Sequence, residues 1–165
     1  MQKISNKGFT LIEILVVIGI IALLATIVII AINPARQFAQ ARDTQRTSHV
    51  TSLLDAIGHR IADHKGLFRD PSETTCTTAM DPTLLTAYST STIQQSGAGS
   101  IDLRPCLVPT YITELPIDPS VGTTWDGTTY NTKYGVSRDS SGRIHVVATT
   151  TEPNIPRLTV IEIAR

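Results

Sequence analysis

The first pattern in the chain is an apolar run from Phe9 to Ile32. Its non-apolar positions are Thr10, Glu13, Gly19 and Thr26. As an α-helix, a run of this length extends about 36 Å, which is enough to cross a bilayer with some tilt. A helix is predicted despite the many Ile and Val residues, because unpaired backbone groups are too costly in lipid. Lys3 and Lys7 precede the run and predict a cytoplasmic N-terminus, with the bulk of the chain outside.

Two simpler interpretations of the apolar run leave features unexplained. A secretory signal peptide has an apolar region of about 7–15 residues followed by a small-x-small cleavage site, whereas this run is longer and continues into a helical pattern. A plain single-span anchor fits the length but does not explain Glu13, since an acid inside a bilayer is costly and usually has a partner. Glu13 is therefore the residue of the run that points to a function.

The sequence predicts that the helix continues beyond Asn33-Pro34 as an amphipathic half, which gives one long helix of over fifty residues. A kink or local melting is expected at the proline, because proline removes a backbone donor and disfavours helix at the residue before it. One apolar stripe follows at helical spacing, and we expect it to pack on a sheet: Val50, Leu53, Leu54, Ile57 and Ile61. Charged residues lie mostly off this stripe and predict a solvated or inter-subunit face: Arg42, Asp43, Arg46, Asp55, Arg60 and Asp63. Gly66 is the predicted C-terminal cap.

The remaining chain reads as a β-rich head. Residues 72–92 hold eleven Ser or Thr among twenty-one positions and predict a polar loop or short helices, an interpretation that we favour over an O-glycosylated segment. Residues 96–100 predict a flexible turn. Strands are predicted within 128–138, 143–151 and 157–165, with a hairpin turn at Ser141-Gly142. Three or four antiparallel strands packed on the helical stripe make an α+β domain.

Charge and cysteine content limit the classes of protein to which the chain can belong. The chain has a formal net charge of zero, and residues 66–165 carry seven basic and ten acidic side chains. This is not the basic surface of a nucleic-acid-binding protein, so no nucleic-acid partner is expected. The two cysteines, Cys76 and Cys106, follow the apolar run. In an exported domain they predict one disulfide, and the alternative is a pair of free buried thiols in a cytosolic domain.

Catalytic patterns are not found in the sequence, and no enzyme is expected. There is no Gly-x-Ser-x-Gly motif, P-loop or dinucleotide fingerprint. His59 and Asp63 are four residues apart on a predicted helix and would need further ligands to hold a metal, so a solvated face explains them better. The other histidines likewise lack metal-ligand spacing: His49, His64 and His145.

The stretch KGFTLIEILVVIGIIALLA resembles the N-terminus of the type IV pilin family. Lys7-Gly8 matches the end of the family's short basic leader, Phe9 its first mature residue, and Glu13 the acid at the fifth mature position. The resemblance implies the pilin fold, cleavage after Gly8 by a prepilin peptidase and N-methylation of Phe9. It also implies that Gly19 and Pro34 mark segments of the helix that kink or unwind.

The resemblance gives Glu13 a role in assembly. Cleavage frees an ammonium on Phe9, and a buried ammonium and carboxylate stabilise each other far more than either is stabilised alone. We therefore expect Glu13 to stay unpaired until it meets the N-terminus of a neighbouring subunit. The implied partners are further copies of the chain, the prepilin peptidase, membrane lipid before assembly, and an inner-membrane assembly platform with its ATPase. The implied location is the bacterial cytoplasmic membrane, followed by a periplasmic or surface filament.

A second resemblance covers residues 110–147. The pattern Tyr-Ile-x-x-Leu-Pro-x-Asp-Pro, from Tyr111 to Pro119, is similar to the head of the major secretion pseudopilins. Some of these proteins bind calcium through loop oxygens, and the corresponding candidates are Asp118, Asp126 and Asp139. No other cofactor is expected.

Together these features predict four segments. They are a leader (1–8), a transmembrane and polymerisation helix (9–32), an amphipathic helix that continues into the head (33–66) and a globular β-rich head (67–165). The expected function is that of a structural subunit of a type IV pilus-like filament. Two alternatives remain: a major pseudopilin of a type II secretion or DNA-uptake system, and a membrane-anchored extracytoplasmic binding domain.

Overall fold

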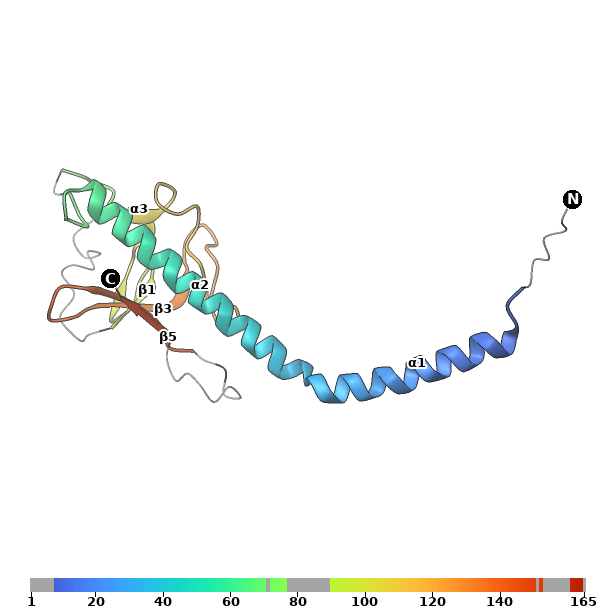
Figure 1. The fold of residues 1–165 in the computed structure, drawn as a ribbon. Coiled ribbons are helices and arrows are strands. Elements are labelled where there is room, and N and C mark those ends of the chain that lie inside the picture. The colour runs from blue at the N-terminus through green and yellow to red at the C-terminus, as the bar shows by residue number, and fades with distance from the viewer. Residues whose placement is uncertain (1–7, 71, 77–89, 151, 153–160, 165) are drawn as a thin grey trace, which may run out of the picture. The chain divides into compact units, whose positions relative to one another are not determined.

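The structure is a computed structural model that describes residues 8–70, 72–76, 90–150, 152 and 161–164 (Figure 1). The chain divides into two compact units, residues 1–38 and 39–165, which are described separately below. Three sequence predictions fall partly or wholly outside the described residues: the leader up to Lys7, most of the Ser/Thr-rich segment, and the first part of the last strand.

The first unit contains helix α1, Leu11–Ile32, and the start of α2. α1 has the length and apolarity of a membrane-spanning helix, and none of its residues is buried in the single chain. The helix is continuous through Gly19 and ends at Asn33, whose φ of 47° lies in the left-handed region. Pro34 then begins α2, as its fixed φ and missing N–H favour the first turn of a helix. Unwinding at Gly19 within a filament stays a prediction.

Helix α2, Pro34–Asp63, supplies one side of the head core. Four of the five predicted stripe residues are buried, and the fifth, Ile61, packs against the cluster that they form. The helix ends three residues before Gly66. The N–H of Gly66 donates to the carbonyl of Ile61 at 2.8 Å, and Lys65 and Gly66 both have positive φ. Gly66 thus belongs to a Schellman-type C-terminal turn.

The expectation that the charged residues of α2 form a solvated or inter-subunit face is wrong for three of the six. Asp43, Arg46 and Arg60 are buried, with Arg46 fully inaccessible. These residues continue the apolar stripe at helical spacing. Asp43 lies seven positions and Arg46 four positions before Val50, and Arg60 lies three positions after Ile57. They are tolerated inside the head because each is paired with oppositely charged groups.

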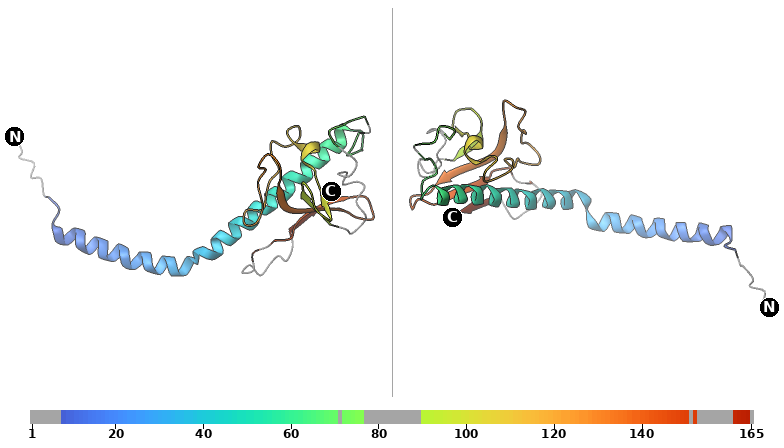
Figure 2. Two further views of the ribbon diagram at one scale, coloured as in Figure 1. Left: turned by 180° about the vertical axis from the view of Figure 1, so that it is seen from behind. Right: turned by 90° about the horizontal axis from the view of Figure 1, so that it is seen from above.

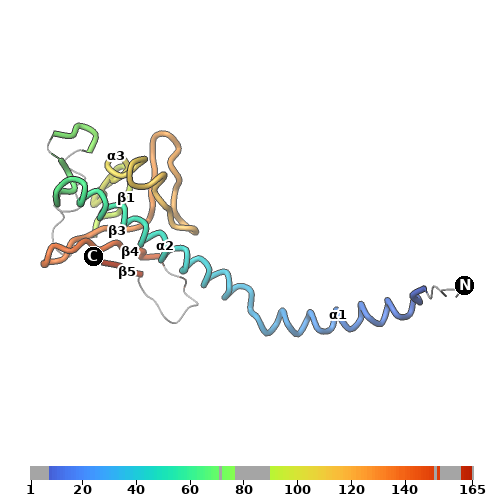
Figure 3. Tube along the Cα trace, turned by 45° about the horizontal axis from the view of Figure 1, so that its top comes forward, coloured from blue at the N-terminus to red at the C-terminus, as the bar shows by residue number. Residues whose placement is uncertain are grey.

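The head has one five-stranded sheet in the order β2-β1-β3-β4-β5. Figures 2 and 3 show the strands of the head beside α2. The strands are β1 (Ser91–Gln94), β2 (Ser100–Ile101), β3 (Asn131–Arg138), β4 (Ile144–Ala148) and β5 (Ile161–Ala164). All neighbouring pairs are antiparallel except β1 and β2, which are parallel. The predicted α+β class is confirmed. The predicted three or four antiparallel strands become five, because β1 and β2 are short and lie in polar sequence.

The core lies between α2 and this sheet. Val50, Leu53 and Ile57 share one buried cluster with Ile93 of β1 and Val136 of β3. A four-residue helix, α3 (Arg104–Leu107), closes the core with Cys106 and Leu107. The predicted disulfide joins Cys76 to Cys106, with Cα atoms 4.7 Å apart. The predicted turn at Ser141-Gly142 connects β3 to β4, and Gly142 has a φ of 90°.

Candidate functional site

The N-terminus of α1 brings together the residues that the sequence assigns to processing and assembly. Gly8 and Phe9 are exposed, and Phe9 retains 85% of its accessible surface. Thr10 is the N-cap of the helix, and Glu13 is its third residue. Phe9, Ile12, Glu13, Val16 and Val17 line one shallow depression, so the carboxylate lies among apolar side chains.

Glu13 is paired within its own chain. Its Oε2 atom accepts hydrogen bonds from the backbone N–H and the hydroxyl of Thr10, both at 2.8 Å. In return, the N–H of Glu13 donates to Oγ1 of Thr10 at 3.3 Å, which completes a capping box. The expectation that Glu13 is unpaired before assembly is therefore wrong for the isolated chain. Thr10 also follows the predicted cleavage point after Gly8, so the same partner would remain after removal of the leader.

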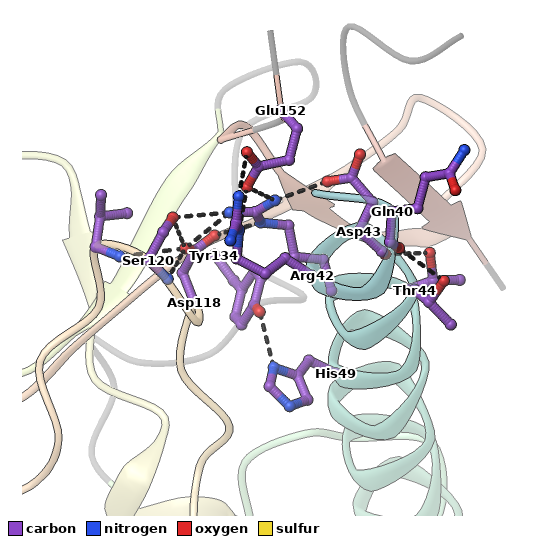
Figure 4. Close-up of polar contacts among 12 residues, drawn as sticks. Gln40, Arg42, Asp43, Thr44, His49, Asp118, Ser120, Tyr134 and Glu152 are labelled. Atoms are coloured by element: carbon purple, nitrogen blue, oxygen red, sulfur yellow. Dashed lines mark hydrogen bonds and ion pairs between the residues drawn. The ribbon is translucent and has the colours of Figure 1, made fainter. Parts of the chain in front are cut away.

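The second cluster of polar residues lies in the head and includes Asp43, Asp118 and Glu152 (Figure 4). All three carboxylates form ion pairs with Arg46. Nε and Nη2 of Arg46 donate to Oδ2 and Oδ1 of Asp118 at 2.8 and 3.2 Å. Nη1 donates to Asp43 at 2.7 Å and to Glu152 at 3.1 Å, and Nη2 donates to the hydroxyl of Ser120 at 2.8 Å. One guanidinium thus links α2 to the loop after residue 116 and to the connection that follows β4.

Arg42, one helical turn earlier, completes this network. Its Nε and Nη2 atoms donate to the two oxygens of Glu152 at 2.7 and 2.8 Å. The hydrogen bonds from Arg42 lower the pKa of Glu152 to about 2, against an opposing effect of burial. Burial by itself raises the pKa of Asp118, but hydrogen bonds from Arg46 and Ser120 outweigh it and lower that pKa. Both carboxylates are therefore ionised at neutral pH.

A neutral pair lies beside the charged network. The hydroxyl of Tyr134 is 2.8 Å from Nδ1 of His49, and the two rings meet edge to face. Burial lowers the pKa of His49 and raises that of Tyr134. Both side chains are neutral at pH 7, so this pair adds a hydrogen bond to the network without adding charge.

The calcium candidates are not brought together in the structure. Asp118 binds Arg46, Asp126 accepts hydrogen bonds from the N–H groups of Thr128 and Thr129, and Asp139 lies in the β3–β4 turn. The part of the chain that the structure describes contains no group of three His, Cys, Asp or Glu side chains placed to hold a metal ion. Exposed His59 and Asp63 form no such group either.

The Arg46 network was missed in the sequence. A signal was present, since the apolar stripe of α2 continues at its own spacing through Asp43 and Arg46. Two of the acidic partners of Arg46, Asp118 and Glu152, are 72 and 106 residues away along the chain, and no sequence pattern marks that pairing. Only folding brings them to one place.

Comparison with known proteins gives one match. Residues 4–29 match the prokaryotic N-terminal methylation motif, which covers the leader end, the Gly8-Phe9 junction, Glu13 and most of α1. No curated protein and no solved structure matches the chain significantly. The motif carries a class III signal peptide and implies processing by a prepilin peptidase. This motif at the start of an exposed apolar helix, followed by an α+β head that contains a disulfide, supports a type IV pilin-like prepilin.

Proposed function

We propose that the mature chain, beginning at Phe9, is the structural subunit of a type IV pilus-like filament and polymerises through α1. The observation that carries the proposal is the exposed apolar surface of α1 in the single chain. Its 22 residues are apolar enough to span a membrane, and not one of them is buried. In the membrane, lipid covers this surface. Outside it, only other apolar helices can do so, and further copies of the chain are the natural source.

Glu13 sets the register of this assembly in the proposal. The ammonium of an incoming Phe9 competes with Thr10 for the Glu13 carboxylate, and a charged donor in an apolar site forms the stronger bond. The capping box keeps the carboxylate satisfied while the subunit waits in the membrane. When the neighbouring subunit docks, the Glu13 carboxylate releases the Thr10 donors and binds the neighbour's ammonium instead.

The test combines mass spectrometry with electron microscopy of sheared material from cells that express the full chain. A mature subunit starts at Phe9, carries one added methyl group and is recovered in filaments. Glu13→Gln keeps the length of the side chain but removes its charge. We expect processed, membrane-inserted protein with filament yield reduced by about tenfold or more, as for the loss of a buried ion pair. Thr26→Val is the matched control, because it alters the other polar side chain of α1, which bonds only to the carbonyl of Ala22 one turn earlier.

Two results would contradict the proposal. Retention of Met1 to Gly8 without any polymer would identify a membrane-anchored binding domain instead. Normal filament yield from Glu13→Gln would remove the register role of the carboxylate.

The second candidate is a major pseudopilin of a secretion or DNA-uptake system. It is supported by the residue pattern from Tyr111 to Pro119, within which Leu115 and Asp118 are buried. Deletion of the gene separates the two candidates. Loss of surface filaments supports the pilus, whereas loss of protein secretion or of DNA uptake with surface filaments intact supports the pseudopilus.

A further inference from the structure

The second buried arginine of α2, Arg60, lies between the two chain segments that carry the cysteines. It is 3% exposed and occupies the last turn of the helix. One segment, residues 67–76, follows α2 and ends at Cys76. The other contains α3 and Cys106, and Figures 1 and 3 show α3 beside the C-terminal half of α2.

Each nitrogen of the Arg60 guanidinium binds a different group. Nε donates to the carbonyl of Phe68 at 2.7 Å, and Nη1 donates to the carbonyl of Cys106 itself at 2.8 Å. Nη2 forms an ion pair with Glu73, three residues before Cys76. The planar fork of an arginine can reach three acceptors in this way, whereas a lysine ammonium presents one point charge.

Aromatic rings support the same guanidinium. Its Cζ atom lies 5.3 Å from the ring centroid of Phe68 and 5.8 Å from that of Tyr111, which follows α3. Cation–π contacts of this kind are strongest where water is excluded. Arg60 is thus bound by both cysteine-bearing segments through backbone and ring contacts.

The disulfide connects the same two segments. Residues 67–70 and 72–76 contain no helix or strand, so ladder hydrogen bonds do not hold this segment in place. The equilibrium for closing a disulfide depends on how often the two thiols meet, that is, on their effective concentration. Contacts that hold both segments to one side chain raise that concentration before any covalent bond exists.

We propose that Arg60 is the positioning residue for the Cys76–Cys106 disulfide and holds the two thiol-bearing segments together in the reduced head. In the reaction the two thiols lose two electrons and two protons to a disulfide-class oxidant. With glutathione disulfide, one protein disulfide forms and two glutathione thiols are released. Arg60 takes no part in the exchange of sulfur atoms. The inference concerns the folding of the head and holds whether or not the chain polymerises.

The first experiment measures the thiol–disulfide equilibrium of the full-length chain in detergent micelles with reduced and oxidised glutathione, followed by thiol trapping and mass spectrometry. Arg60→Lys keeps the charge beside Glu73 but cannot reach both carbonyls. We expect it to lower the effective concentration of the thiol pair by about tenfold, as for the loss of charge-assisted hydrogen bonds. The matched control is Arg46→Lys, the same change at the other buried arginine of α2, which touches neither cysteine segment. We expect it to leave the effective concentration within about twofold, since distant sites act independently.

The second experiment tests the reduced state directly and does not depend on the redox equilibrium. In the full-length Cys76→Ser/Cys106→Ser chain, we expect the amides of residues 67–76 to stay protected from hydrogen exchange, and to lose that protection when Arg60→Lys is added. Equal effects of Arg60→Lys and Arg46→Lys in the first experiment would overturn the proposal. Loss of protection in the double serine variant, with Arg60 intact, would also overturn it, because the disulfide alone would then hold the segment. Protection that survives the addition of Arg60→Lys would overturn it as well, because core packing would then hold the segment without help from Arg60.

Discussion

Arg46 and Asp118 form a two-point ion pair in the interior of the head, with both side chains inaccessible or nearly so. The pair joins the middle of α2 to a loop that begins 70 residues later in the chain. Asp43 and Glu152 share the same guanidinium. A buried charge is costly unless it is paired, so these residues are stable only as a set.

The first prediction concerns removal of the shared cation. Arg46→Met leaves Asp118 and Asp43 buried without their partner, and we expect the free energy of unfolding to fall by about 3–5 kcal/mol. Denaturant unfolding of the full chain in detergent, followed by circular dichroism, measures this loss. Arg36→Met, at an exposed position of the same helix, should change the free energy by less than about 0.5 kcal/mol. A loss below about 1 kcal/mol for Arg46→Met would show that the pair is not needed.

The second prediction concerns the stability of the head at acidic pH. The pKa values of Asp118 and Glu152 are lower in the folded head than in an unfolded chain, and that of Glu152 is about 2. Their contribution to stability is thus fully present above pH of about 4 and is lost as the pH falls towards the folded values. Unfolding midpoints measured between neutral pH and pH of about 2 should decrease across this range. Glu152→Gln should flatten that decrease, and an unchanged acid profile for this variant would contradict the assignment.

The third prediction concerns the capping box of α1. Thr10→Val removes the hydroxyl that donates to the Glu13 carboxylate and accepts from the Glu13 N–H. We expect the free energy for opening the first turn of α1 to fall by about 1 kcal/mol. Hydrogen exchange of the amides of residues 11–14 in micelles should become faster. Thr10→Ser keeps the hydroxyl and is the matched control. Exchange that is equal in both variants would mean that the box does not hold the turn.

The fourth prediction contrasts two glycines. A Cβ on Gly135 of β3 would lie 2.4 Å from Cγ2 of Thr90 and 3.0 Å from Cγ2 of Val147. Gly135→Ala should therefore destabilise the head by about 1–3 kcal/mol through overpacking. Gly58 is an exposed position inside α2 with open space around it. Gly58→Ala should stabilise the head by about 0.5–1 kcal/mol, because alanine is the better helix former. Thermal unfolding measures both, and effects of the same sign would contradict the prediction.

The structure of the N-terminal apolar segment, residues 9–34, was determined by the sequence itself. No residue of α1 is buried among the described parts of the chain, so its helical structure and its length depend on local composition and on the cost of unpaired backbone groups in lipid. The interruption at Asn33-Pro34 is equally local, because it depends on the covalent structure of proline. The apolar stripe of α2, the β3–β4 turn and the Cys76–Cys106 pair were also predicted from local patterns, from cysteine count and from the expected export of the head.

The tertiary structure decided which polar residues are buried and what they bind. A charged side chain by itself predicts a surface position for both Arg46 and Arg60. The burial of Arg46 is stable because Asp118 and Glu152 lie beside it, and that of Arg60 because Glu73 and two carbonyl groups do. The two short strands likewise depend on their neighbours, because Ser91–Gln94 and Ser100–Ile101 have little periodicity of their own. β1 pairs with the edge of β3, and β2 pairs with β1. The Thr10–Glu13 capping box is not one of these tertiary contacts, because Thr followed three residues later by Glu is a local sequence signature of a helix N-terminus. Contacts between residues far apart in sequence are set by the whole fold, and a local pattern does not encode them.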